Sequence, residues 1–151
     1  MSPRNLPGFT LIELLIVVAI IGLVTAIAVP NLANAIDRSR QKRTMADMRV
    51  IGAACEEYSL DHDFFPIQTH QGSVAGISSI LTPDYSKALP EKDGWDWYLQ
   101  YGTPAGGSSY TVRSFGKDGA KNGIDGPTTE FNCDIIFQQG HFTSYPSGVP
   151  H

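Results

Sequence analysis

A long apolar run near the N-terminus constrains this chain more than any other feature of its sequence. Sixteen residues without a charge run from Leu14 to Val29, "LLIVVAIIGLVTAIAV". Counted from Phe9 the apolar stretch has 21 residues, among which Glu13 is the one carboxylate. About 20 predominantly apolar residues are enough to span a bilayer as a helix. The run therefore predicts a membrane helix, and Glu13 needs an explanation.

The carboxylate of Glu13 is costly in this position. An acidic side chain inside a membrane segment costs about 2.5 kcal/mol or more and usually has a partner. No Lys, Arg or His lies within the segment, so the partner must come from another chain or from a newly made N-terminus. Alternatively, Glu13 lies at headgroup depth. The residues after the run continue in helix-compatible sequence without a clear A-x-A-like site, which favours an uncleaved anchor over a secretory signal peptide.

The stretch "PGFTLIELLIVVAIIGLVTAIAVP", Pro7 to Pro30, closely resembles the N-terminus of type IV pilins and of the pseudopilins of type II secretion systems. The resemblance implies a leader peptide of residues 1–8. It implies that a prepilin peptidase cuts between Gly8 and Phe9 and methylates the new amine of Phe9. Pro30 falls where many family members have a helix-loosening proline, so we expect a helix break near it in an assembled filament.

The resemblance also provides a partner for Glu13. When cleaved subunits stack in a helical filament, the ammonium group of Phe9 in one subunit can pair with Glu13 of its neighbour. Such a pair is much stronger in a low-dielectric helix core than on a surface. Because an unpaired carboxylate is costly there, the pair would favour the correct axial register.

Beyond the apolar run, residues 31–65 are predicted to form the amphipathic second half of one long helix. Apolar residues recur there at helical spacing, at Leu32, Ala35, Ile36, Met45, Met48, Ile51, Gly52 and Cys55. The polar stretch "DRSRQKR" is interpreted as a solvated face, with contact to anionic lipid headgroups as the alternative. The helix would run from about Phe9 to about Leu60, roughly 78 Å.

Residues 66–151 are predicted to form a globular head. A short helix is expected around Ser73–Leu81, followed by strands within "WDWYLQYG", "SSYTVRSFG" and "DIIFQQG". The expected fold class is α+β, a long N-terminal helix packed on a small antiparallel sheet. "ALPEKDGWDWYLQY" is similar to the "LP-x-DPWG-x-x-Y" stretch of major pseudopilins, with departures at Gly94 and Asp96, where that family often has Pro and Gly.

The stretch "SFGKDGAKNGIDGPTTEFNCDI" is a loop rich in glycine and oxygen-bearing side chains. The latter are Asp118, Asn122, Asp125, Glu130, Asn132 and Asp134. Calcium takes six to eight such oxygens, yet the spacing is not that of an EF-hand, and chemistry alone favours an ordinary polar loop. The resemblance to major pseudopilins implies a structural calcium ion held by Asp118, Asp134 and Asp125 with main-chain oxygens.

Cys55 and Cys133 admit two interpretations. In an oxidising periplasm they could form a disulfide, and otherwise each is a buried free thiol. His62, His70, His141 and His151 are scattered without a ligand pattern, and we find no nucleophile elbow or other catalytic context. The chain is therefore predicted not to be an enzyme.

The whole sequence resembles a major pseudopilin, stored in the inner membrane of a Gram-negative bacterium with its head in the periplasm, then assembled into a periplasmic filament. The implied partners are other copies of the chain, the prepilin peptidase, minor pseudopilins and an inner-membrane assembly platform. The alternative is a type IV pilin of a surface fibre for motility or adhesion. A plain membrane-anchored binding module would keep residues 1–8. A net charge of -4 without a basic stripe argues against nucleic acid as a partner.

Overall fold

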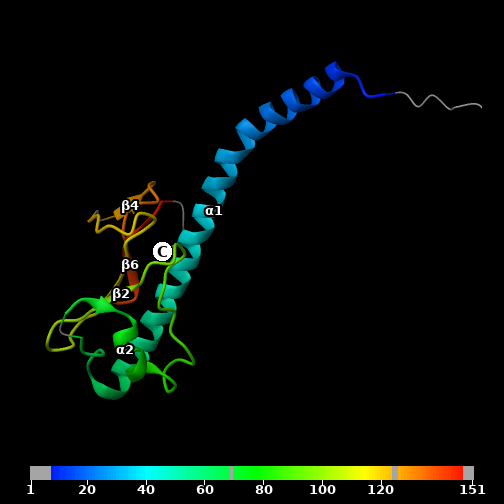
Figure 1. Ribbon diagram of the computed structural model, residues 1–151. Helices are drawn as coiled ribbons and strands as arrows, with labels where there is room; N and C mark the ends of the chain where they lie inside the picture. The colour runs from blue at the N-terminus through cyan, green and yellow to red at the C-terminus, as the bar shows by residue number, and fades with distance from the viewer. Residues whose placement is uncertain (1–7, 69, 124–125, 148–151) are drawn as a thin grey trace, which may run out of the picture. The chain divides into compact units, whose positions relative to one another are not determined.

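A computed structural model describes residues 8–68, 70–123 and 126–147 of the chain. The chain divides into two compact units, with the boundary between Ile36 and Asp37. Helix α1, Leu11–His62, begins in the first unit and ends in the second (Figure 1). Its 52 residues confirm the predicted long helix, with each end displaced by two residues from the prediction.

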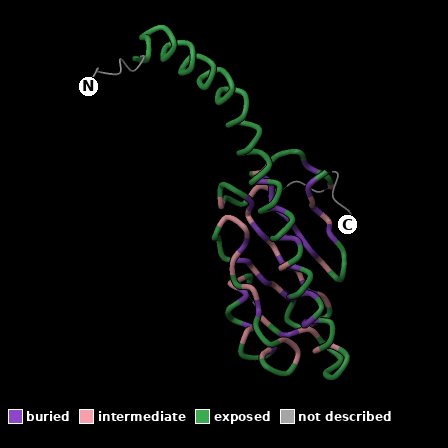
Figure 2. Tube along the Cα trace, turned by 90° about the vertical axis from the view of Figure 1, so that its right-hand side faces the viewer, coloured by how far each residue is buried: buried purple, intermediate pink, exposed green. Residues whose placement is uncertain are grey.

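The first unit buries none of its described residues. Every residue from Gly8 to Ile36 is exposed, and Figure 2 shows the helical part of this range as a continuous green helix. Among the described residues, α1 is the one helix long and apolar enough to cross a membrane. Its large apolar side chains are therefore left in need of an apolar environment that this unit does not supply within its described residues.

Helix α1 continues through Pro30, so the break predicted there is not present in the single subunit. Proline lacks the N–H that would bond the carbonyl group of Ala26. In the same turn, the side-chain amide of Asn31 donates to the carbonyl oxygen of Ile27 at 3.1 Å. One missing bond is tolerated within a helix of this length. Loosening of this segment in an assembled filament stays a prediction.

The second unit holds one short helix and a six-stranded sheet. The sheet order is β1-β2-β3-β5-β6-β4, and the neighbours are antiparallel except β4 and β6, which are parallel. The elements are α2 (Ala75–Leu81), β1 (Gly72–Ser73), β2 (Gln100–Gly102), β3 (Thr111–Ser114), β4 (Gly126–Thr128), β5 (Ile135–Gln138) and β6 (His141–Pro146).

The α+β class, the short helix and three strands were predicted correctly. Strands β2, β3 and β5 lie within the three expected stretches, whereas β1, β4 and β6 were not predicted. Two-residue β1 and the Gly-Pro strand β4 carry little sequence signal. Strand β6, "HFTSYP", has alternating burial, so its period of two was available in the sequence.

The core of the second unit forms where the sheet meets α1 and α2. Register places Val112 of β3 opposite Phe137 of β5, and Phe137 opposite Phe142 of β6. The helical residues that pack there are buried as the spacing predicts, namely Met45, Met48, Ile51, Cys55, Ile77 and Leu81. Because every member of this core lies between residues 45 and 142, the second unit has its own hydrophobic core.

Gly52 is the point of closest approach between α1 and the sheet. A Cβ atom there would lie 2.8 Å from the hydroxyl oxygen of Tyr110 and still closer to the ring of Phe137. The Tyr110 hydroxyl donates to Glu56 of α1 at 2.8 Å. The missing side chain at residue 52 therefore lets the two aromatic rings pack against the helix.

Candidate functional site

The N-terminus of α1 is closed by a capping box. Thr10 precedes the first helical residue, Leu11, and its backbone N–H and hydroxyl donate to Glu13 Oε2 at 2.9 and 2.7 Å. The backbone N–H of Glu13 donates back to Thr10 Oγ1 at 3.3 Å. Glu13 thus satisfies helix-end donors within its own subunit. The T-x-x-E signature of a capping box is present in the sequence as "TLIE", so this cap could have been predicted.

The predicted cleavage site lies directly before this cap. Gly8 and Phe9 are outside the helix, and both are exposed, Phe9 to 77%. An exposed, non-helical peptide bond is the kind of backbone that a peptidase can reach. The N-terminal part of the site therefore combines an accessible Gly8–Phe9 bond with a carboxylate four residues beyond it.

In the head, Asp93 organises the turn that contains both tryptophans. Its Oδ1 accepts from the backbone N–H groups of Trp95 and Trp97 at 2.9 and 3.0 Å. Its Oδ2 accepts from the hydroxyl of Ser114 in β3 at 2.6 Å. A buried carboxylate with three hydrogen bonds fixes this turn to the sheet.

The two departures from the family pattern have clear structural settings. Asp96 has a φ of 74°, in the left-handed region that favours glycine and that aspartate adopts more readily than most other residues. Gly94 lies against α1, where a Cβ atom would be 2.8 Å from the Cα of Arg40. Its N–H donates to Thr44 Oγ1 at 2.9 Å, a bond that proline could not make.

Asp37 connects α1 to two loops of the head. It is 5% exposed and Gln41 is 4% exposed, although both belong to the stretch interpreted as a solvated face, so that interpretation is wrong for these two residues. Its carboxylate accepts from Trp95 Nε1 at 3.1 Å and from Lys117 Nζ at 2.8 Å. The bond from Lys117 contributes most to holding the pKa of Asp37 below its ordinary value.

The loop predicted to bind calcium leaves β3 through Gly116. This glycine has a φ of 70°, and a Cβ atom on it would lie 2.7 Å from the carbonyl oxygen of Cys133. The next N–H, that of Lys117, donates to the carbonyl oxygen of Phe131 at 2.8 Å. The two ends of the loop are therefore held against each other by a close backbone approach.

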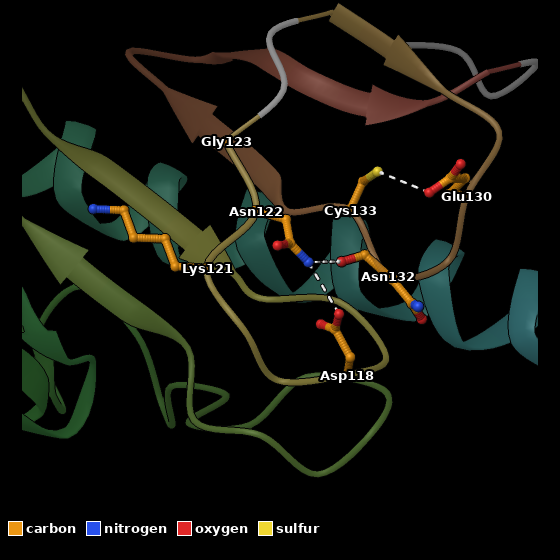
Figure 3. A pocket seen from close by; sticks show the side chains of 7 residues that line it. All are labelled: Asp118, Lys121, Asn122, Gly123, Glu130, Asn132 and Cys133. Atoms are coloured by element: carbon orange, nitrogen blue, oxygen red, sulfur yellow. Dashed lines mark hydrogen bonds between the residues drawn. The ribbon is translucent and has the colours of Figure 1, made fainter.

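The loop encloses an open pocket of about 490 Å³, shown in Figure 3. Asn122 lies at its centre. The side-chain amide nitrogen of Asn122 donates to Asp118 Oδ2 at 3.0 Å and to the carbonyl oxygen of Asn132 at 3.2 Å (Figure 3). Its backbone N–H donates to Asp134 Oδ1 at 2.9 Å. One residue thus joins three groups that could bind a cation.

Asp134 is the fully buried member of this group. Its Oδ2 is buried without a hydrogen-bond partner and lies 3.7 Å from Arg113 Nη1, which also has none. Burial raises the pKa of this carboxyl. A buried carboxylate oxygen without a hydrogen bond is costly unless a cation or proton compensates it, and the Arg113 guanidinium supplies part of that compensation.

The predicted calcium ligands are partly brought together. Asp118 and Asp134 both contact Asn122, whereas Asp125 lies outside the described residues. Within the part of the chain that the structure describes, no cluster of three or more His, Cys, Asp or Glu side chains could hold a metal. Two carboxylates and a main-chain carbonyl fit the oxygen preference of calcium, although they are fewer than its usual six to eight ligands.

The two cysteines are free thiols in the structure, so the disulfide interpretation is not supported. Cys55 is buried in the core, and burial raises the pKa of its thiol to about 12. Cys133 is buried beside the loop pocket, with Sγ 4.0 Å from Glu130 Oε2. A helix with a buried stripe and a loop with its own polar bonds hold these regions without a bridge.

The fold and the N-terminal segment together define a pilin-like subunit. The chain has an exposed apolar helix of membrane length, which is capped just after an accessible Gly-Phe bond. The second half of the same helix packs on a small sheet. A family model described as the prokaryotic N-terminal methylation motif matches residues 4–29. A second, described as type II secretion system protein G, matches residues 31–131. The chain belongs to the type II secretion system protein G family.

Individual relatives agree with this assignment. The type II secretion system core protein G of Vibrio cholerae is 32% identical over 128 residues, covering 80% of this chain and 86% of that protein. The protein of the same name from Pseudomonas aeruginosa is also 32% identical, over 143 residues, covering 89% of this chain and 99% of that protein. The similarity therefore spans both units of the chain.

Proposed function

We propose that this chain is the major pseudopilin of a type II secretion system, a structural subunit that assembles into a periplasmic filament driving protein export. The observation that carries the proposal is the unburied apolar part of α1, from Leu11 to Ile36, joined to a head with its own core. This segment suits two environments in turn, the bilayer before assembly and the packed helices of a filament afterwards.

Processing would convert Glu13 from a capping residue into a pairing residue. Prepilin peptidase would cut the exposed Gly8–Phe9 bond and methylate the new amine of Phe9. In the subunit, the Glu13 carboxylate accepts hydrogen bonds from Thr10. In a filament, the same carboxylate has a remaining oxygen with which to pair with the amine of a neighbouring copy. The pair would set the axial register of the subunits.

The head would act as a rigid body that gives the filament its outer surface. Its bonds from Asp37 and Asp93 fix the loops that carry Trp95 and Lys117 against α1 and the sheet. An assembly ATPase elsewhere would supply the work, and this chain would supply the helix, the register pair and the rigid head. The head would stand in the periplasm.

A calcium ion would stabilise the head loop. Asp118, Asp134 and the carbonyl oxygen of Asn132 are the described groups that would hold it. When bound, calcium would neutralise the clustered carboxylates and tie the loop ends together. We expect calcium to raise the melting temperature of the mature chain in detergent relative to a chelator control. Equal melting temperatures in both conditions would remove the site.

A type IV pilin of a surface fibre is the second candidate, since it shares the N-terminal segment. The head disfavours it, because residues 31–131 match the secretion family and the two cysteines are free and do not close a C-terminal loop. Deletion of the gene separates the two candidates. Loss of protein export supports the pseudopilin, whereas loss of surface fibres with export intact supports the pilin.

The first experiment is the intact mass and N-terminal sequence of the protein purified from its native membrane. A chain beginning at methylated Phe9 would establish prepilin processing. A chain that retains residues 1–8, or one cut after the apolar run, would mean an ordinary anchor or signal peptide, and the filament proposal would fall.

A further inference from the structure

The amide nitrogen of Asn122 occupies the position between acceptor oxygens where a loop cation would be expected. It donates to a carboxylate oxygen of Asp118 and to the carbonyl oxygen of Asn132 (Figure 3). Both are hard oxygen acceptors of the kind that calcium binds. An N–H donor and a cation compete for such oxygens, because each presents positive charge to the same lone pairs.

The positively charged guanidinium group of Arg113 faces the other carboxylate of the loop, that of Asp134. Arg113 of β3 lies with Nη1 3.7 Å from Asp134 Oδ2, and its side chain is only 16% exposed. The separation is too long for a hydrogen bond, and both atoms are buried without one. The guanidinium group therefore partly compensates the Asp134 charge without occupying its Oδ2 lone pairs.

We propose that Asn122 is a built-in substitute for the loop cation, holding Asp118 and the Asn132 carbonyl together and competing with calcium for them. The claim that Asn122 competes with calcium rests on the proposed calcium site. Its structural part stands on the hydrogen bonds of Asn122 alone. The side chain of Asn122 would accordingly join Asp118 to Asn132 when calcium is absent, and the loop would bind the ion more weakly than a loop without a donor at residue 122.

The side chain of Asn122 can be substituted without removing the hydrogen bond that its backbone makes. Its N–H donates to Asp134 Oδ1, and an alanine would keep this bond while removing both side-chain bonds. Asn122→Asp is more informative still, because it has the same shape, loses the donor and adds a carboxylate. The exposed Thr129 in the same loop provides a matched control, Thr129→Ala.

The experiment uses the mature full-length chain in detergent, melted with chelator and with calcium chloride, and titrated with calcium by calorimetry. In chelator, Asn122→Ala should melt about 3 °C below wild type, and Asn122→Asp lower still because its carboxylate repels Asp118. Calcium should bind Asn122→Ala about fivefold more tightly than wild type, and should restore the melting temperature of Asn122→Asp. Thr129→Ala should match wild type throughout.

The outcomes separate this inference from the calcium proposal. Suppose that wild type and Asn122→Ala bind calcium with equal affinity and have equal melting temperatures in chelator. The proposed role of Asn122 is then wrong, and the calcium site stands. If neither wild type nor any variant binds calcium, the calcium proposal is wrong. The melting temperatures in chelator then test whether the Asn122 side chain holds the loop together. A lower melting temperature for Asn122→Ala than for Thr129→Ala then supports it, and equal values overturn it.

Discussion

The two halves of helix α1 have opposite relations to the rest of the chain. From Leu11 to Ile36 the helix is almost entirely apolar and entirely exposed. From Asp37 to His62 it is mostly polar, yet it buries a stripe of residues against the head. Apolar composition therefore does not by itself show where a helix is buried, because the apolar first half is exposed and the polar second half is partly buried.

This difference separates assembly from folding. Burial of the first half, at about 25 cal/mol per Å² of apolar surface, depends on lipid or on neighbouring subunits. Burial of the second half belongs to the core of the head. Substitutions in the first half should thus change assembly without changing unfolding of the head, and substitutions in the second should do the reverse.

The largest expected effect is at Glu13. Glu13→Ala should lower filament yield at least about tenfold, because it removes the register pair, which is strong in a low-dielectric core. Electron microscopy and sedimentation of assembled material would measure the yield. The melting temperature of the head should not change.

Glu13→Gln is the control that separates the two uses of this residue. Glutamine can replace glutamate in a capping box, so the helix cap is kept while the charge is lost. If the ion pair sets the register, Glu13→Gln should fail to assemble as Glu13→Ala does. Assembly of Glu13→Gln at the wild-type level would show that only the cap matters.

The same substitution at two glycines of α1 tests the comparison directly. A Cβ atom at Gly52 would collide with Phe137 and Tyr110. A Cβ atom at Gly22 would have no atom within 4 Å apart from its chain neighbours and the nearby backbone of its own helix. Gly52→Ala should destabilise the head by about 1–3 kcal/mol through overpacking. Gly22→Ala should leave unfolding of the head unchanged. Denaturant unfolding followed by tryptophan fluorescence reports both, and equal effects would contradict the separation.

Asp37 marks the boundary and provides a pH test. Asp37→Asn should destabilise the head by about 1–2 kcal/mol at neutral pH, since a charge-assisted bond to the half-exposed Lys117 is lost. The pKa of Asp37 is lowered, so its contribution exists above the ordinary value of 3.8 and is lost as pH falls through the lowered pKa.

The measurement is the difference in unfolding free energy between wild type and Asp37→Asn at several pH values. We expect this difference to shrink in strong acid, below the ordinary pKa of Asp37. A difference that stays constant from neutral pH to strong acid would mean that the charge of Asp37 does not stabilise the fold.

The smallest effect concerns the cysteines. Cys55 should resist alkylation in the folded head, because burial keeps its thiol protonated at physiological pH. Denatured chains should show two alkylatable thiols. Mass spectrometry of the native protein under non-reducing conditions should give the mass of the dithiol form. A mass two hydrogens lighter would restore the disulfide interpretation.

Local patterns were sufficient for much of the architecture. The apolar run and the helical spacing of Met48, Ile51 and Cys55, which are three and four residues apart, predicted α1 to within two residues at each end. The motif around Gly8 and Phe9 predicted the family. Strand β4 escaped prediction because a Gly-Pro strand depends on a neighbouring strand for its conformation, whereas β6 carried an alternation that was available.

The sequence by itself determined the membrane-length helix, the leader motif and the α+β class, since these depend on periodicity and on neighbours a few residues away. Only the tertiary structure decided the burial of Asp37, whose partners Trp95 and Lys117 lie 58 and 80 residues further along the chain. It likewise decided that Asn122 joins Asp118 to Asn132. Hydrogen bonds of this kind are specified by where the folded backbone places donors and acceptors, and no local spacing encodes that placement.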